Sequence, residues 1–367
     1  MKKFAVLAAI VLLAGVGVFA QSTSTTDMNA LIAAAKAEGQ LTVIALPHDW
    51  VNYGEMIQKF SAKYGITINE LNPDGSSAEE IEAIKANENN KGPQAPDVID
   101  VGLKFGPEAV AAGLLSPYKV QTWDSIPKDV KDKDGYWYGD YYGALAFEVN
   151  SDIVKNVPRT WSDLLKPEYK GKFALSGDPR ISAQAYMTVI AASLANGGSL
   201  DNVQPGLQYF AKMNKIGNLV PLIAVTGTLA SGETPITIEW DYNALANKDK
   251  LNGNPNIQVI VPPTGVVAGI YIQGISAYAP HPNAARLWEE YLYSDEGQLI
   301  WLKGYGHPIR FNDLANRGVV PADLAAKLPP SSAYANVVFP TLDQQTVLAQ
   351  AIANGWDKIV GANIQAK

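Results

Sequence analysis

Apolar and polar residues follow one another along the chain in a pattern that predicts short buried strands, each leading into a polar loop and a helix. The first apolar run, at residues 41–46, is typical of a buried strand, and apolar residues within 56–64 recur at the spacing of one helix face. A glycine ends this helix before a second strand-like run at residues 66–71. This order predicts a parallel strand pair with a right-handed helical crossover.

The same pattern recurs further along the chain. A third strand is expected at residues 97–101, with a glycine-containing loop and a short helix at 107–112 behind it. A second sheet begins at residues 171–175 and includes the apolar run at 236–240. In α/β sheets of this kind, ligands bind at the carboxyl ends of the strands, where helix N-termini offer free backbone N–H groups. The chain is therefore expected to be an α/β protein with its site at these ends.

Two longer runs predict crossings between two lobes. The run at residues 144–149 follows a cluster of five aromatic side chains within 135–142, and the run at 267–278 is rich in glycine and β-branched residues. We predict that the first run leads out of lobe 1 and that the second returns beside it at a hinge. A length of 367 residues suits about two domains. The expected lobes are residues 27–149 with 267–305, and residues 150–266 with 306–367.

The N-terminus has the features of a secretory signal peptide over residues 1–20. Two lysines precede an apolar run at residues 4–18, and residues 18–20 resemble a cleavage site. This run is too short for a typical membrane span, and a polar linker at 21–26 follows it. We therefore expect a periplasmic protein without stable membrane insertion after cleavage.

Composition narrows the chemistry further. The chain has no cysteine, which excludes disulfides, a lipid-anchoring cysteine and thiolate metal sites. The formal charge of −7 becomes −9 when the two signal lysines are removed, and this acidity argues against nucleic acid or an anionic membrane as a partner. No hydrolase, metalloprotease or nucleotide-binding motif occurs in the expected mature chain. We expect a binding protein without a cofactor rather than an enzyme.

The candidate ligand-binding residues follow predicted strands or lie on the two crossings. Some have a second interpretation: Ser76, Ser77 and Asp241 are also typical helix caps, and Arg180 could clamp an anion or form a surface ion pair. The aromatic residues and Gln273 could pack in the core instead. The full set is His48, Asp49, Trp50, Tyr53, Ser76, Ser77, Tyr141, Tyr142, Arg180, Trp240, Asp241, Tyr242, Tyr271 and Gln273.

Three segments resemble motifs of the family 1 extracellular solute-binding proteins. Residues 161–172, WSDLLKPEYKGK, are similar to the pattern W-x-D-L-x-x-P-x-x-K-G-K, and residues 95–99, APDVI, resemble the A-D-V stretch of that family. Residues 282–298 resemble its late A-A and S-x-E-G-Q run. The resemblance implies a two-lobed periplasmic-binding-protein fold whose lobes close on a solute. It also implies a monomer that delivers this solute to the permease of an ABC importer.

The resemblance leaves three ligand classes open. Ferric iron would use His48, Asp241 and Tyr242, which are suitable ligands for a hard cation. A polyamine or another organic cation would be held by aromatic rings and carboxylates. The acidic candidates for that role are Asp49, Asp140, Glu239 and Asp241.

A phosphonate or organophosphate is the third class, and Arg180, Ser76, Ser77 and helix N-termini would hold it. Two alternatives to import also remain at this point. One is a chemosensory binding subunit that uses the same cleft. The other is a secreted enzyme on the same fold, for which the chain shows no nucleophile and base motif.

Overall fold

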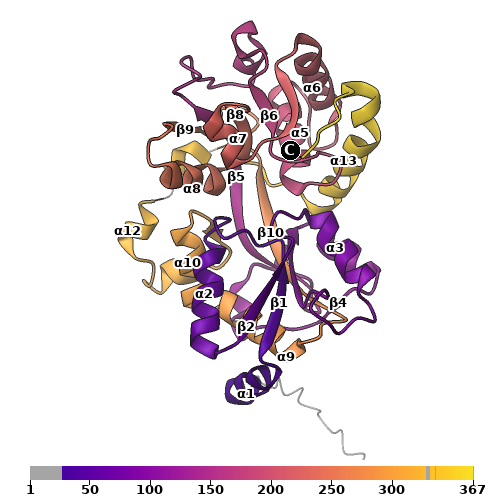
Figure 1. Ribbon diagram of the computed structural model, residues 1–367, viewed down its shortest axis with the longest axis vertical. Helices are drawn as coiled ribbons and strands as arrows, with labels where there is room; N and C mark the ends of the chain where they lie inside the picture. Colours follow the sequence, from indigo (N-terminus) through magenta and orange to yellow (C-terminus); the bar gives the residue numbers. More distant parts are fainter. Residues whose placement is uncertain (1–26, 328–330, 335, 367) are drawn as a thin grey trace, which may run out of the picture.

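A single long strand, β5 (Tyr138–Asn150), runs through the middle of the molecule and is shared by two lobes (Figure 1). It pairs with β10 (Ala268–Ser276) as far as Ala144, and with β8 (Ile236–Trp240) from Leu145 onward. Both pairings are antiparallel. The lobes therefore meet where β5 exchanges one partner for the other. This computed structural model describes residues 27–327, 331–334 and 336–366, so the expected signal peptide and linker lie outside the described residues.

The first lobe contains the predicted β-α-β unit. Its strands are β1 (Gln40–Ile44), β2 (Thr67–Leu71), β3 (Val98–Gly102), β4 (Leu115–Ser116) and part of β5 and β10. Its helices are α1 (Met28–Glu38), α2 (Tyr53–Tyr64), α3 (Ser77–Ala86), α4 (Phe105–Ala111), α9 (Pro282–Leu292) and α10 (Asp295–Lys303). Strands β1 and β2 pair in parallel with α2 between them, which confirms that prediction. Strand β3 pairs antiparallel with β10, so its carboxyl end faces the other lobe.

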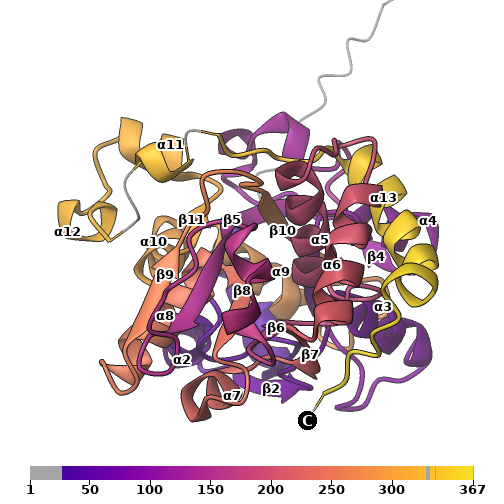
Figure 2. The same cartoon turned by 90° about the horizontal axis from the view of Figure 1, so that it is seen from above.

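The second lobe forms around the far half of β5. Its other strands are β6 (Phe173–Leu175), β7 (Leu219–Ile223), β8 and β9 (Ile257–Ile260). Its helices are α5 (Ala183–Ala195), α6 (Gln204–Ile216), α7 (Thr226–Ser231), α8 (Asp241–Leu251) and α13 (Leu342–Gly355). In Figure 2, α5, α6 and α13 lie together at one side of this lobe. The main sheet has the order β3-β10-β5-β8-β6-β7 and is continuous through both lobes.

The C-terminal part of the chain contacts both lobes. The short strand β11 (His307–Pro308) pairs with β5, α12 (Ala322–Ala325) packs against α10, and α13 packs against α5. Between them, α11 (Phe311–Asn316) follows β11. We therefore propose that residues 306–327 belong with the first lobe and that the chain reaches the second lobe later than residue 306.

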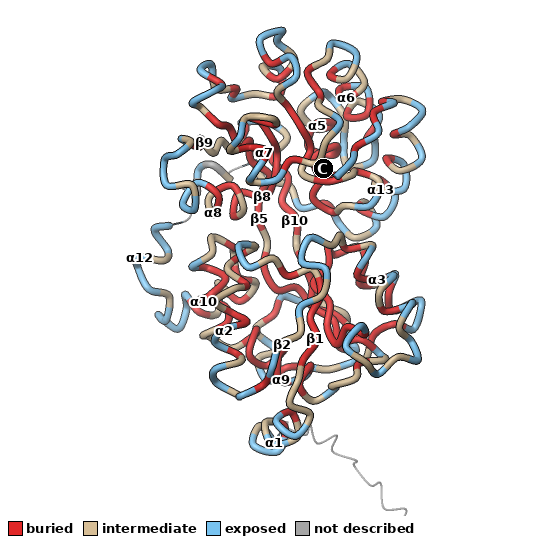
Figure 3. Tube along the Cα trace, viewed as in Figure 1, coloured by how far each residue is buried: buried red, intermediate tan, exposed pale blue. Residues whose placement is uncertain are grey.

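Burial follows the two sheets. In Figure 3 the strands of both lobes are largely buried, whereas α12 and many loops are exposed. The predicted strand at 144–149 begins earlier, at Tyr138, because Tyr138 and Gly139 already pair with β10. Part of the aromatic stretch is therefore strand rather than loop. Within the described ranges, no helix combines the length and the apolar character that crossing a membrane requires.

Candidate functional site between the lobes

Five aromatic side chains join the two lobes, and we call them the interlobe aromatic cluster: Trp50, Tyr141, Trp240, Tyr242 and Tyr271. The ring of Trp50, from the loop before α2, lies 5.6 Å from Tyr242 of α8 and 5.5 Å from Tyr271 of β10. Tyr141 stacks on Tyr271 with ring centroids 5.6 Å apart. All five were sequence candidates, and the structure brings them together.

Two hinge glycines allow the cluster to lie against the strands. Gly143 of β5 and Gly269 of β10 are paired across the sheet. A Cβ atom on Gly143 would lie 2.5 Å from two ring carbons of Tyr242, and one on Gly269 would lie 2.3 Å from the Trp240 ring. Since such distances are far inside van der Waals contact, only glycine lets these rings from the second lobe cross the hinge strands.

An acidic pair lies next to the cluster on the side of the first lobe. Trp50 Nε1 donates to the Tyr141 hydroxyl, which donates to Asp100 Oδ2, both at 2.7 Å. Gln273 Nε2 donates to Asp140 Oδ2 at 2.8 Å and to the Tyr53 hydroxyl at 3.0 Å. The candidates Tyr53 and Gln273 thus hold the acidic pair, Asp100 and Asp140, and belong to the same site.

Both carboxyl groups are almost completely buried, which changes their protonation. Burial raises the pKa of Asp100 to about 6. Burial, and then the charge of Asp100, raise the pKa of Asp140 well above its usual range. Close carboxyl groups of this kind share a proton because both cannot ionise cheaply in a low-dielectric environment. The pair would be better satisfied by a positively charged partner.

Sequence reasoning missed Asp100. Its strand was predicted at residues 97–101, and the signal that could have revealed Asp100 is an acidic residue between the apolar residues Ile99 and Val101. The structure shows it 5% exposed. A buried acid in a strand needs a partner, and here the Tyr141 hydroxyl provides one hydrogen bond.

Of the two serine candidates, Ser76 is the N-cap of α3, whereas Ser77 is the first residue of that helix. Ser76 forms a capping box with Glu79, whose carboxylate accepts from the Ser76 backbone N–H at 2.7 Å. The Ser77 hydroxyl accepts from the backbone N–H of Gly102 at 3.2 Å. These bonds stabilise the start of α3 and connect it to the end of β3. The capping interpretation is confirmed for Ser76 only, since Ser77 bonds to β3, and a role of either serine in anion binding stays a prediction.

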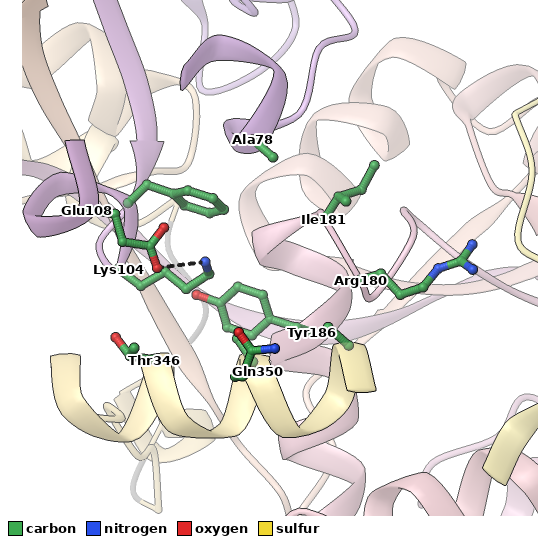
Figure 4. A pocket seen from close by; sticks show the side chains of 11 residues that line it. Ala78, Lys104, Glu108, Arg180, Ile181, Tyr186, Thr346 and Gln350 are labelled. Atoms are coloured by element: carbon green, nitrogen blue, oxygen red, sulfur yellow. Dashed lines mark hydrogen bonds and ion pairs between the residues drawn. The ribbon is translucent and has the colours of Figure 1, made fainter. Parts of the chain in front are cut away.

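Arg180 lies in a groove of about 220 Å³ at one side of the lobe interface (Figure 4). Its guanidinium donates to both carboxylate oxygens of Asp178 at 2.6 to 3.0 Å and to Asp357 at 2.9 Å. Across the groove, Lys104 pairs with Glu108 at 3.3 Å. The ion-pair alternative for Arg180 is therefore the one that the structure contains, and an anionic ligand would have to compete with two carboxylates.

His48 and Asp49 line a second groove, of about 480 Å³, on the other side of the interface. His48 Nε2 lies 2.7 Å from Glu70, and its side chain is largely exposed. Asp49 accepts from Lys250 of α8 at 2.6 Å, which is an ion pair between the lobes. Neither side chain has a described contact with the interlobe aromatic cluster.

Asp241 and Tyr142 lie behind the hinge. Asp241 Oδ1 accepts from the backbone N–H of Ala144 at 3.1 Å, and Asp241 Oδ2 accepts from the Tyr334 hydroxyl. The Tyr142 ring stacks on His307 at 4.7 Å. These contacts join α8, β5 and the C-terminal segment, so the structure gives both residues partners outside the aromatic cluster.

The proposed iron ligands are consequently spread over three places: His48 in a side groove, Asp241 behind the hinge and Tyr242 in the cluster. In the described residues, no group of three or more histidine and acidic side chains is placed to hold a metal ion. The structure therefore gives the ferric-iron alternative no support.

A second buried acidic pair lies in the second lobe. Glu148 of β5 and Glu239 of β8 point to the same side of the sheet, where Asn247 Nδ2 donates to Glu239 at 3.1 Å and to Glu148 at 3.4 Å. Burial raises the pKa of Glu239 to about 7 and that of Glu148 well above its usual range. Glu239 was an acidic candidate for an amine, but its bond here is to Asn247.

Comparison with known proteins gives a consistent result. A family model described as bacterial extracellular solute-binding protein matches residues 94–337. A putative 2-aminoethylphosphonate-binding periplasmic protein of Salmonella typhimurium is 26% identical over 286 residues, covering 75% of this chain and 80% of that one. The spermidine/putrescine-binding periplasmic protein of Escherichia coli is 26% identical over 250 residues, covering 65% and 63%.

The fold also matches solved structures. The periplasmic binding protein AfuA of Actinobacillus pleuropneumoniae, with fructose-6-phosphate bound, superposes with a TM-score of 0.69 at 22% identity. The match covers 88% of this chain and 99% of that one. This likeness shows that the two-lobed fold is shared.

Proposed function

Because the chain belongs to the bacterial extracellular solute-binding protein family, we propose that it captures a small organic solute between its lobes and delivers it to an ABC importer permease. The interlobe aromatic cluster carries this proposal. It lies where the carboxyl ends of the strands face the other lobe, and in α/β proteins this is the usual place for a ligand.

The cluster is suited to report closure. Trp50 belongs to the first lobe and Tyr242 to the second, and their rings are 5.6 Å apart. A hinge rotation about the β5 and β10 strands would separate these rings and open the space between the lobes. A solute held between them would then stabilise the closed arrangement by its contacts with both lobes.

The place of action follows from the relatives. The relatives from Salmonella typhimurium and Escherichia coli are periplasmic proteins. We propose that this protein is likewise exported to the periplasm, that residues 1–20 serve as its signal peptide, and that it acts as a carrier rather than as an enzyme.

The relatives also suggest the first ligands to test. 2-Aminoethylphosphonate, spermidine and putrescine differ in charge and length, but each contains an aliphatic primary amine. Ferric iron and fructose-6-phosphate represent the other classes. Together they form a panel for the purified protein.

Thermal denaturation of the purified protein with this panel tests the proposal. A specific solute at 100 times its dissociation constant should stabilise the folded protein by roughly 2.7 kcal/mol and raise its melting temperature. Trp50→Leu should weaken binding of the active solute at least about fivefold, since an interface aromatic of this kind contributes more than about 1 kcal/mol.

Phe339→Leu is the matched control, because the Phe339 ring is exposed and lies behind the hinge. Among the described aromatic rings, it contacts that of Tyr142 and no other. The variant should leave binding unchanged. A panel in which no solute shifts the melting temperature would refute the proposed ligand classes. Equal binding by the wild type and Trp50→Leu would move the site away from the cluster.

A further inference from the structure

We infer that the solute carries an ammonium group and that Asp100 is the side chain that receives it, with Asp140 completing the acidic end of the site. This inference rests on the proposed function and names the ligand chemistry of the same cleft. It concerns a residue on β3 that the sequence did not single out.

Buried acidic side chains without a basic partner gather at this end of the cleft. Asp100 is 5% exposed, Asp140 is fully buried, and Glu80 beside them accepts from the backbone N–H of Asp100 at 3.0 Å. None of the three takes part in an ion pair with any lysine, arginine or histidine that the structure describes. Their bonds go to hydroxyl, amide and backbone groups. Burying a carboxylate without a positive partner is costly, so this end of the cleft favours a cation.

The opposite lobe contributes a buried polar group that has no partner among the described residues. The Tyr242 hydroxyl is completely buried and has no hydrogen-bond partner among the described residues. Its ring crosses Gly143 and meets the edge of Tyr141 at 5.7 Å, so it extends towards the lobe that holds Asp100. Oδ1 of Asp100 likewise accepts no hydrogen bond from a basic, amide or backbone N–H group in the described part of the chain. Buried polar atoms are normally paired, and both of these could pair with an ammonium N–H.

Asp100 also faces the lobe interface. Positions 100 and 102 lie on the same side of β3 because side chains alternate along a strand. A Cβ atom on Gly102 would lie 2.7 Å from the Cβ of Ala183, at the start of α5 in the second lobe. The side of β3 that carries Asp100 is therefore the side that the second lobe closes against.

A short chain of hydrogen bonds connects Asp100 to Trp50, whose contact with Tyr242 would open when the lobes separate. Trp50 donates to Tyr141 and Tyr141 donates to Asp100. When Tyr242 moves away with the second lobe, Tyr141 and Asp100 form the floor of the opening. The surrounding rings of Trp50, Tyr141, Tyr242 and Tyr271 present π faces and edges that suit an alkylammonium group by cation–π contact.

The test combines a change in the ligand with a change in the protein. Isothermal titration of the full mature chain should show that 2-aminoethylphosphonate binds at least about 30-fold more tightly than ethylphosphonate, which lacks the amine. Putrescine against butan-1-ol provides the same comparison without a phosphonate. In Asp100→Asn the amine preference should fall to within about threefold, because the charge is gone while the amide can still accept from Tyr141.

Glu289→Gln is the control for the loss of a buried carboxyl group. This side chain is fully buried on α9 of the same lobe and makes no bond to the acidic pair. The variant should keep the full amine preference. Thermal denaturation of both variants checks that they fold. If Asp100→Asn does not fold, the comparison of amine and amine-free ligands on the wild-type protein still tests the inference.

The outcomes separate the two proposals. If fructose-6-phosphate or iron binds and no amine does, the carrier function stands and the ammonium inference is overturned. Equal weakening of amine and amine-free ligands by Asp100→Asn would also overturn it, since the aspartate would then have a structural role. If no probe binds to the wild type, the proposed ligand classes fail and the inference fails with them.

Discussion

At the scale of single residues, the buried carboxyl groups are the unusual feature of this protein. Glu148 and Glu239 share one amide, that of Asn247, and no basic side chain pairs with either in the described residues. The neighbouring charge across the interface is Asp49, which is also negative. Such a pair is stable only while it keeps a proton, so its charge state is linked to folding.

This linkage gives a pH prediction. The folded-state pKa of Glu239, about 7, lies above the usual value of 4.5, so its contribution to the free energy of unfolding is fully present below about pH 4.5 and is lost as the pH rises through 7. Asp100, with a pKa of about 6, adds to the same trend. The free energy of unfolding should therefore fall between pH 5 and 7.5, by on the order of 1 kcal/mol per pH unit for each proton.

Urea denaturation at a series of pH values measures this slope. Glu239→Gln removes one carboxyl group of the pair and should flatten the decline, whereas Glu82→Gln, at an exposed position on α3, should leave it unchanged. Parallel pH profiles for the wild type and Glu239→Gln would contradict a shared proton in this pair.

At the scale of elements, the hinge depends on close contact between strands and rings. Strands β5 and β10 pair through Gly143 and Gly269, and Trp240 and Tyr242 at the start of α8 lie over these glycines. Asp241 between them accepts from the hinge backbone at Ala144. Three consecutive residues of the second lobe thus contact the strands of the first.

Gly143→Ala is expected to disturb both stability and binding. The new methyl group would overlap the Tyr242 ring, and overpacking of this kind typically costs about 1–3 kcal/mol. Thermal denaturation and ligand titration should both show the loss. Gly227→Ala is the control, since a Cβ there meets no atom within 4 Å and α7 would gain up to about 1 kcal/mol of helix propensity. A stable, fully binding Gly143→Ala variant would show that Tyr242 does not need its observed position.

At the scale of the whole molecule, the lobes are joined by the aromatic cluster in the middle and by polar contacts at one side. On one side Lys250 and Asp49 pair at 2.6 Å, and the Tyr305 hydroxyl bonds to Asp249. The side chain of Lys250 is 58% exposed and that of Asp49 is 47% exposed. Exposed pairs contribute little because water and salt screen them.

Lys250→Ala should therefore change solute affinity by no more than about fivefold at low salt, and the difference should vanish in concentrated salt. Titration of the active solute at two salt concentrations measures this. Lys85→Ala, which removes an ion pair within α3 of the first lobe, is the matched control. A much larger loss in Lys250→Ala would mean that Lys250 contacts the solute itself.

Local patterns in the sequence were enough to predict the elements and the two crossings. The run at 236–240 is β8, and the run at 267–278 contains β10, because burial on a sheet leaves a short apolar signature that needs no knowledge of its partners. The same reasoning placed Trp50, Trp240 and Tyr242 at strand ends. Five candidate aromatic residues could thus be named before their contacts were known.

Only the tertiary structure decided which of these residues share a site. Tyr141 forms a hydrogen bond with Asp100, whereas the neighbouring Tyr142 stacks on His307. Arg180 forms ion pairs with two aspartates. Adjacent strand residues point to opposite sides of the sheet, and ion pairs form between segments far apart in the chain. The sequence by itself therefore determined the two-lobed carrier and the strand ends at its cleft. Which charges remain unpaired in that cleft depends on how the lobes pack together.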